Sequence, residues 1–335
     1  MTSSKDQVIL GIESSCDDTA AAVVDEAGRV LSSVVVSQVE IHAAHGGVFP
    51  EMASRAHVTA MVPCITKALA DAGVTQRDLR AIGVTRGPGL IGPLLVGLNA
   101  AAGVGLGWGV PVIGVNHLRG HLRSADLDEQ RVRFPALLLL VSGGHTLLAH
   151  MATAHDVRIL GSTRDDSVGE AYDKVGRLMG LGYPAGAKVD RLAATGDGSH
   201  LRLPRPMIAD GLDFSFSGLK SAMSKYFPLD GAYRLEDLAA SFVDACMDVL
   251  IEKSRRALAA HPSRSLVVVG GVAASPQLRS AAQTLCAEMG VELCLPPLRW
   301  STDNAAMIAL AAWDYLSLET APRPIAQPNL RVDQW

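Results

Sequence analysis

One local pattern occurs twice in this sequence, and the repetition limits the folds open to the chain. An apolar run, a polar turn and a second apolar run lie at Val8 to Ile12, Glu13 to Thr19 and Ala20 to Val24, and again at Ala136 to Val141, 142–145 and Thr146 to Met151. Apolar runs of this length around a tight turn predict strand–turn–strand units. Two such openings predict an internally duplicated α/β protein with two lobes and a cleft between them.

Other apolar segments extend both halves. Further strands are predicted at Val30–Ser37, Leu79–Thr85, Pro111–Val115, Val157–Gly161 and Leu266–Val269, and helices around Glu170–Met179, Lys188–Ala194, Leu235–Ala260 and Asn304–Leu316. Val58, Met61, Val62, Ile65 and Leu69 have the spacing of one helix face, and that helix should end near Gly73.

A polar, turn-like stretch from Arg123 to Arg133 separates the two halves. We predict an N-terminal lobe of residues 1–131 plus about 304–335, which carries a histidine pair, and a C-terminal lobe of residues 132–303, which carries glycine-containing turns. In this division the final helix crosses back to the first lobe.

Charge and cysteine content bear on the binding partners and on the cellular compartment of the protein. The 335 residues carry 30 Lys and Arg against 34 Asp and Glu, a net charge of −4, which argues against a freestanding nucleic-acid binder. Five cysteines without a C-x-x-C pair favour a reducing cytosol.

We expect no signal peptide at the start. The uncharged stretch Gly87–Asn116 contains three prolines and is predicted as a buried helix followed by a strand, without membrane association.

Three turns are candidates for phosphate binding. They are Glu13–Thr19, Ser142–Thr146 and Gly270–Ser275. Glycine lets backbone N–H groups approach an anion closely, and hydroxyl side chains add donors. An ordinary hairpin turn explains any one of them alone. The whole arrangement is typical of actin-like ATPases, sugar kinases and seventy-kilodalton heat-shock chaperones.

His117 and His121 are spaced so that both project from one face of a helix and can share a metal. Two solvated histidines on a polar helix face are the alternative. Leu118 follows His117, so the pair is not the H-E-x-x-H signature of a metallopeptidase. Asp303 precedes the final helix and by default would be an N-cap or first-turn acid.

Segments along nearly the whole chain resemble one family. They are GIESSCDDTAAAVVD, GGVFPEMASRAH, TRGPGLIGPLLVG, NHLRGH, LLLVSGGHT, GEAYDKVGRLMGLGYPAG, FSFSGLKS, VVVGGVAAS and STDNAAMIA. In this order they resemble the universal tRNA N6-threonylcarbamoyladenosine transferases, once labelled O-sialoglycoprotein endopeptidases, in the bacterial and organellar branch. The resemblance implies the duplicated actin-like, ribonuclease-H-like two-lobe fold.

The resemblance also implies the site residues. The family's metal ligands fall on His117, His121 and Asp303, for iron or alternatively zinc. Its substrate- and nucleotide-binding positions fall on Leu140, Val141, Ser142, Gly143, Gly144, Asp173, Gly186, Asp190 and Ser275. Ser275 stands where the family usually has Asn, Asp18 where Glu is common, Arg119 where bacterial members often have an acid, and Ala185 where Gly is usual.

The activity implied is acyl transfer. The N6 amine of the adenosine 3′ of the anticodon, in tRNAs that read codons beginning with A, attacks the carbamoyl carbon of threonylcarbamoyl-AMP and expels AMP. This amine is a poor nucleophile, so positioning and charge stabilisation must supply most of the acceleration. Asp17 or Asp18 is the candidate proton acceptor. His145, beside the backbone donors at 142–144, is the candidate at the departing AMP.

The family also implies partners, and other functions stay open. The expected partners are tRNA, a paralogous actin-like dimerisation subunit and a P-loop ATPase. An ATP-dependent kinase on the same fold explains the turns but not the histidine pair. A metallopeptidase explains the pair but lacks the glutamate base. A nucleotide-gated scaffold without catalysis is the third alternative.

Overall fold

The structure is a computed structural model that describes residues 7–129, 132–229, 231–316, 318 and 321–334. The chain divides into two compact units: unit 1 comprises Met1–Arg131 and Pro296–Trp335, and unit 2 comprises Val132–Leu295. The chain therefore returns to the first unit at 296 rather than near 304. Asp303 belongs to unit 1, whereas the predicted division placed it in the C-terminal lobe.

Unit 1 is built on a five-stranded mixed sheet. Its strands are β1 (Val8–Glu13), β2 (Asp18–Asp25), β3 (Val30–Ser37), β4 (Leu79–Gly87) and β5 (Val112–Asn116), in the order β3-β2-β1-β4-β5. Its helices are α1 (Val39–Ala43), α2 (Pro50–Ala72), α3 (Ile91–Trp108), α4 (His117–Ser124) and α10 (Ala305–Leu316), with short 3₁₀ turns at 76–78, 127–129 and 298–300. β1, β2 and β3 pair antiparallel, whereas β1, β4 and β5 pair parallel.

Unit 2 repeats this arrangement. Its strands are β6 (Ala136–Val141), β7 (Thr146–Met151), β8 (Val157–Ser162), β9 (Ser265–Val269) and β10 (Glu292–Cys294), in the order β10-β9-β6-β7-β8. Its helices are α5 (Val168–Leu178), α6 (Gly186–Ala193), α7 (Ser217–Met223), α8 (Leu235–Ala260) and α9 (Pro276–Met289), with 3₁₀ turns at 198–200, 224–226 and 271–274. β6, β7 and β8 are antiparallel and β6, β9 and β10 parallel, so the predicted duplication is confirmed strand for strand.

The sequence located most elements but missed some. All the predicted strands and helices are present, including the helices now seen as α2 and α3. The helices α1, α7 and α9 and the strand β10 were not predicted. α2 ends at Gly73 as expected, yet its apolar spacing does not mark one buried face: Met61 and Ile65 are buried, whereas Val58 and Val62 are exposed.

α3 occupies most of the uncharged stretch predicted as a buried helix. Within the described ranges it alone is long and apolar enough to cross a membrane, by length and composition only. One third of it, 33%, is buried inside the protein. The strand expected after it is β5.

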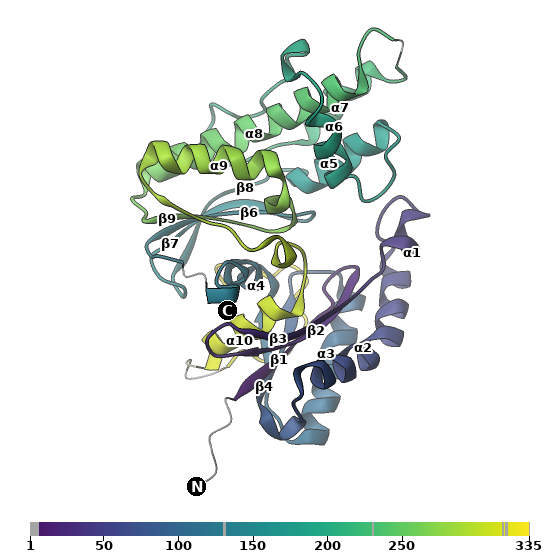
Figure 1. Ribbon diagram of the computed structural model, residues 1–335, viewed down its shortest axis with the longest axis vertical. Helices are drawn as coiled ribbons and strands as arrows, with labels where there is room; N and C mark the ends of the chain where they lie inside the picture. Colours follow the sequence, from purple (N-terminus) through teal and green to yellow (C-terminus); the bar gives the residue numbers. More distant parts are fainter. Residues whose placement is uncertain (1–6, 130–131, 230, 317, 319–320, 335) are drawn as a thin grey trace. The chain divides into compact units, whose positions relative to one another are not determined.

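Helices cover both faces of the unit 1 sheet (Figure 1). One face packs against α2 and α3 and the other against α10, which is drawn in yellow beside the purple strands of the N-terminus. α10 approaches β1 closely at Gly11, where a Cβ would lie 2.1 Å from the carbonyl oxygen of Ala305 and 2.9 Å from the Cβ of Ala309. Because backbone atoms block the position, only glycine fits.

We predict that Gly11→Ala lowers the free energy of unfolding by about 1–3 kcal/mol, because α10 must move away from β1 to make room for the methyl group. Gly103→Ala in α3 is the matched control, since no atom lies within 4 Å of its added Cβ. The control should be neutral or slightly stabilising by helix propensity. Denaturant melts followed by circular dichroism measure both, and equal midpoints for the two variants would contradict the packing account.

Candidate functional site

The site in unit 1 lies where three neighbouring parallel strands end. β1 ends at Glu13, β4 passes Thr85 near its end, and β5 ends at Asn116 immediately before His117. Ile12 pairs with Val84, so the following residues Glu13 and Thr85 lie next to each other. The carboxyl ends of parallel strands are a common position for ligand sites in α/β sheets.

His117 and His121 are presented by the short helix α4. Asn116 caps this helix by accepting a hydrogen bond from the Leu118 N–H at 3.0 Å. Both histidines are buried, and His121 has no exposed surface. Their rings meet edge to face with centroids 4.6 Å apart. The alternative of two solvated surface histidines is therefore wrong.

Asp303 completes a cluster with the two histidines. Its Oδ1 atom lies 3.1 Å from His121 Nε2 and 3.6 Å from His117 Nε2. One ligand atom from each of the three residues lies within 4.8 Å of the others. These residues were predicted as metal ligands, and the structure brings them together. All three belong to unit 1, although the predicted division placed Asp303 in the C-terminal lobe.

By default Asp303 was expected to cap the final helix. The structure shows that it does not. The side chain of Asn304 accepts a hydrogen bond from Met307 N–H at 2.9 Å and so performs the capping role. The Asp303 carboxylate is thereby directed to the histidines.

The cluster fits a divalent metal ion by its donor chemistry. Both ring nitrogens of His121 are buried without a hydrogen-bond partner, although one is close to Asp303. Buried polar nitrogens are rarely left unpaired unless they serve a ligand. Two imidazoles and one carboxylate suit iron or zinc and leave coordination positions open.

Glu13 also belongs to this site, although the sequence predicted it only as the first residue of a phosphate-binding turn. Its buried carboxylate lies 2.8 Å from His117 Nδ1 and 2.6 Å from the hydroxyl of Thr85. Burial lowers the pKa of His117, but the charges of Glu13 and Asp303 raise it more strongly, to about 9. Burial raises the pKa of Glu13, and His117 lowers it below its usual range.

Of the two predicted proton acceptors, Asp17 lies in the turn between β1 and β2, and Asp18 is the first residue of β2. Burial raises the pKa of Asp18 to about 6, with Asp17 and Asp303 adding to the shift, while a hydrogen bond from Ser37 opposes it. A carboxyl with a pKa near 6 is better suited to general base chemistry than an ordinary aspartate. Burial also raises the pKa of the neighbouring Cys16 thiol, which keeps it protonated and unreactive.

The predicted phosphate turn lies in unit 2, between β6 and β7. Gly143 and Gly144 are exposed at its tip, and a Cβ at either would meet no atom within 4 Å. Ser142 N–H donates to the carbonyl of His145 at 2.8 Å, so this amide, expected among the phosphate donors, is used inside the turn. The turn is fixed to α5 because the Ser167 hydroxyl donates to the Gly143 carbonyl at 2.6 Å.

The other predicted nucleotide residues belong to unit 2 as well. Leu140 and Val141 are buried in β6 and hold the turn through their backbone. Asp173 accepts a hydrogen bond from the Ala185 N–H at 2.8 Å, next to Gly186 at the start of α6.

Asp190 and Ser275 are linked to each other through neighbouring groups. Burial raises the pKa of Asp190, and the hydroxyls of Ser275 and Tyr172 act in the opposite direction. Gln277 Nε2 donates to the Asp190 carbonyl at 2.9 Å, and the Ser275 hydroxyl lies 3.3 Å from Gln277 Oε1. The sequence-predicted residues thus form two groups, one in each unit, and His145 belongs to the group in unit 2 rather than with Asp17 and Asp18.

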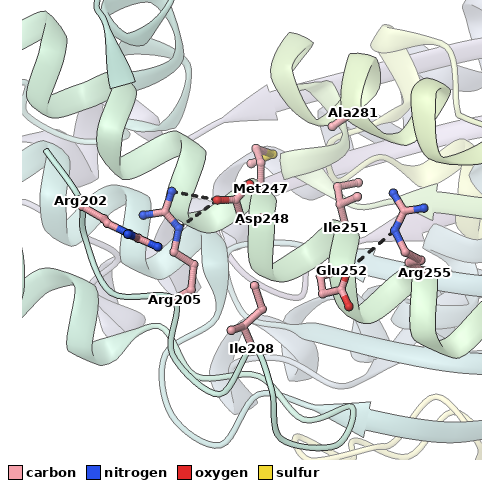
Figure 2. A pocket seen from close by; sticks show the side chains of 9 residues that line it. All are labelled: Arg202, Arg205, Ile208, Met247, Asp248, Ile251, Glu252, Arg255 and Ala281. Carbon is pink, nitrogen blue, oxygen red and sulfur yellow. Dashed lines mark hydrogen bonds and ion pairs between the residues drawn. The ribbon is translucent and has the colours of Figure 1, made fainter. Parts of the chain in front are cut away.

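A hollow of about 590 Å³ on unit 2 contains none of the predicted residues (Figure 2). Its lining is Arg202, Arg205, Ile208, Met247, Asp248, Ile251, Glu252, Arg255 and Ala281. Arg205 pairs with Asp248 at 2.8 Å and Arg255 with Glu288 at 2.7 Å. Because Arg205 and Arg255 are held in ion pairs, the hollow is a weaker candidate than the histidine cluster.

Comparison with known proteins identifies the family. A sequence model described as "TsaD: tRNA N6-adenosine threonylcarbamoyltransferase" matches residues 29–310. A curated tRNA N6-adenosine threonylcarbamoyltransferase of Streptococcus pneumoniae (strain Taiwan19F-14) is 50% identical over 314 residues, which is 92% of each chain. The chain belongs to this family.

Two solved structures of low sequence identity show the same fold. Component A of the Acidaminococcus fermentans (R)-2-hydroxyglutaryl-CoA dehydratase is 16% identical, covers 92% of this threonylcarbamoyltransferase-family chain and 98% of its own, and has a TM-score of 0.57. T. kodakarensis HypF is 12% identical, covers 93% of this chain and 48% of its own, and has a TM-score of 0.61. The predicted actin-like α/β fold with two lobes is confirmed.

We predict that His121→Gln lowers bound metal by about tenfold or more, because a neutral amide is a poor replacement for imidazole. Gln is used because Ala at this fully buried position would leave a destabilising cavity. Metal content is measured by mass spectrometry after loading with Fe²⁺ or Zn²⁺ and desalting. His150→Gln in unit 2 is the control. Equal metal in both variants would remove His121 from the ligand set.

Proposed function

We propose that this protein transfers the threonylcarbamoyl group from threonylcarbamoyl-AMP to N6 of the adenosine 3′ of the anticodon, in tRNAs that read codons beginning with A. The observation that carries the proposal is the family match over 92% of the chain. The cluster of the buried His117 and His121 with the half-buried Asp303 supports it against a kinase on the same fold, which has no need of such a cluster.

His117, His121 and Asp303 are proposed to hold one divalent metal, iron or alternatively zinc. When bound, the ion supplies Lewis acidity and a template for substrate oxygens. The protein contributes a buried position for the ion and excludes water from two of its ligands.

The remaining residues are proposed to bind the nucleotide and move the proton. Backbone groups at Gly143 and Gly144, with Leu140, Val141, Asp173, Gly186, Asp190 and Ser275, bind the adenylate. Asp18 accepts the proton of the attacking amine as the N–C bond forms and the bond to AMP breaks. Its raised pKa makes it the better candidate of the two aspartates. His145 remains a proposed group at the departing AMP.

Mass spectrometry of tRNA nucleosides tests the function. Depletion of this protein in its host should remove N6-threonylcarbamoyladenosine, and the wild-type gene should restore it. Undiminished modified nucleoside after complete depletion would contradict the proposal. A gain of phosphorylated small-molecule product with ATP, and no acyl transfer, would favour the kinase.

Activity should depend on pH through Asp18. As a base Asp18 must be ionised, so with its pKa raised to about 6 the activity should fall as the pH drops through about 6 and level off above it. Asp18→Asn should lower kcat by about 10²–10⁴-fold and remove this acidic limb. Single-turnover rates with saturating substrate measure the profile. If the Asp18→Asn enzyme kept the acidic limb of the wild-type pH profile, another residue would be the base.

Gly144→Val should weaken adenine-nucleotide binding while the protein stays folded. The side chain would enter open space, so no packing is lost, but it would keep phosphate from the turn. Isothermal titration with AMP should show an affinity loss of about tenfold or more. Gly218→Val in α7 is the control, since its Cβ also meets no atom within 4 Å. Equal AMP affinity in both variants would contradict the turn's assignment.

The partner proposals rest on an apolar surface of unit 1. It is defined by side chains of α2 and α3 that are 45–88% exposed, namely Val58, Val62, Ile91, Leu95 and Leu106. Contiguous exposed apolar side chains mark interaction surfaces. We propose that this surface binds the paralogous actin-like subunit, and that a P-loop ATPase and the tRNA complete the complex in the cytosol.

Val62→Asp should weaken binding of the paralogous subunit by about tenfold or more, because a charge would be buried in an apolar contact. The exposed Val36→Asp on β3 is the control. Size-exclusion chromatography of the mixed subunits reads out the complex. A normal complex with Val62→Asp would exclude this surface, and full multi-turnover activity of the isolated chain would exclude the need for partners.

A further inference from the structure

Glu13 occupies an unusual position for a carboxylate. It is the last residue of β1, the central strand of the unit 1 sheet, and it has no exposed surface. Burying a carboxylate costs free energy unless donors surround it. A site that served packing alone would be filled at lower cost by an apolar side chain.

Donors from three separate segments surround the Glu13 carboxylate. Oε1 accepts the backbone N–H of Ser15 at 2.5 Å. Oε2 accepts the hydroxyl of Thr85 at 2.6 Å and faces Nδ1 of His117 at 2.8 Å. The carboxylate therefore joins the β1–β2 turn, the end of β4 and the start of α4.

The contact with His117 decides which ring nitrogen carries the proton. A carboxylate only accepts hydrogen bonds, so Nδ1 of His117 must donate. The lone pair of the neutral ring is then on Nε2, the atom that lies 3.6 Å from Asp303. His121 differs, because neither of its buried ring nitrogens has a hydrogen-bond partner.

We propose that Glu13 is a positioning residue, which holds His117 in the Nδ1–H tautomer with Nε2 directed at the metal, and that Thr85 supports Glu13 in this role. The proposal rests on the metal site proposed above. His117 is then a pre-oriented ligand, whereas neither ring nitrogen of His121 has a hydrogen-bond partner that fixes its tautomer. Carboxylates behind metal-binding histidines commonly raise metal affinity by about 10–100-fold.

The test compares Zn²⁺ affinity of apoprotein variants by competition with a chelator. Glu13→Gln keeps the size of the side chain but loses its charge, and it should weaken Zn²⁺ binding by about 10–100-fold. Thr85→Val keeps the volume, removes one donor from Glu13 and should weaken binding less. Gln38→Leu is the control, because Gln38 is another buried polar partner of a histidine, 3.1 Å from His42 Nε2, outside the site.

A second measurement reads the tautomer directly, without metal or activity. Nitrogen-15 spectra of histidine-labelled apoprotein, at a pH where His117 is neutral, should show protonated Nδ1 in the wild type and a mixture of tautomers in Glu13→Gln. An Nε2–H ring in the wild type would overturn the proposal, even if Glu13→Gln did not fold. Wild-type Zn²⁺ affinity in a folded Glu13→Gln protein would overturn it too.

Zn²⁺ binding by these variants separates a failure of the metal site from a failure of the role of Glu13. If Zn²⁺ does not bind the wild type, or binds His121→Gln equally well, the metal site itself is wrong. If binding needs His121 but is unchanged in Glu13→Gln, only the role of Glu13 is wrong. Weakening in Gln38→Leu equal to that in Glu13→Gln would show a general loss of stability instead of a positioning effect.

Discussion

The contact between α10 and β1 is the interaction on which the unit 1 site depends. At Gly11 the helix backbone approaches the strand so closely that no side chain fits between them. This contact sets the depth at which α10 lies on the sheet and therefore where the loop before it, with Asp303, comes to rest. A sheet alone would present His117 and His121 without their carboxylate.

The sequence predicted the strands of the two sheets better than it predicted the helices and their buried faces. The strands other than β10 were found because each is a short apolar run between turns, and the duplication emerged from two openings of the same pattern. The helix α9 was not predicted, although Ser275 and Pro276 are a good start signal and its buried residues Leu278, Ala282, Leu285 and Cys286 have the spacing of one helix face. α2 was located, but its apolar spacing mixed the buried Met61 with the exposed Val58, because periodicity cannot tell a core face from an interaction face.

The residues of the candidate site also differ in how well the sequence predicted them. His117 and His121 were visible as a pair, and the family resemblance, not their spacing, added Asp303. Glu13 was not visible, since an acid in a polar turn is ordinary. Only the register of β1 against β4, and the start of α4 at the end of β5, place Glu13 against His117. Tertiary pairing of strand ends carries this information, and local patterns do not.

The discontinuity of unit 1 has a consequence for biosynthesis. The ribosome makes the sheet of unit 1 and both histidines first, then all of unit 2, and only then residues 296–335. Until α10 emerges, one face of that sheet has no cover, including Ile9, Ala22 and Ile113, which pack in the same core as α10. Unit 2, continuous in sequence, can complete its own core earlier. The nascent chain therefore brings His117, His121 and Asp303 together in one late step, and a chain that ends before residue 303 contains both imidazoles without the carboxylate.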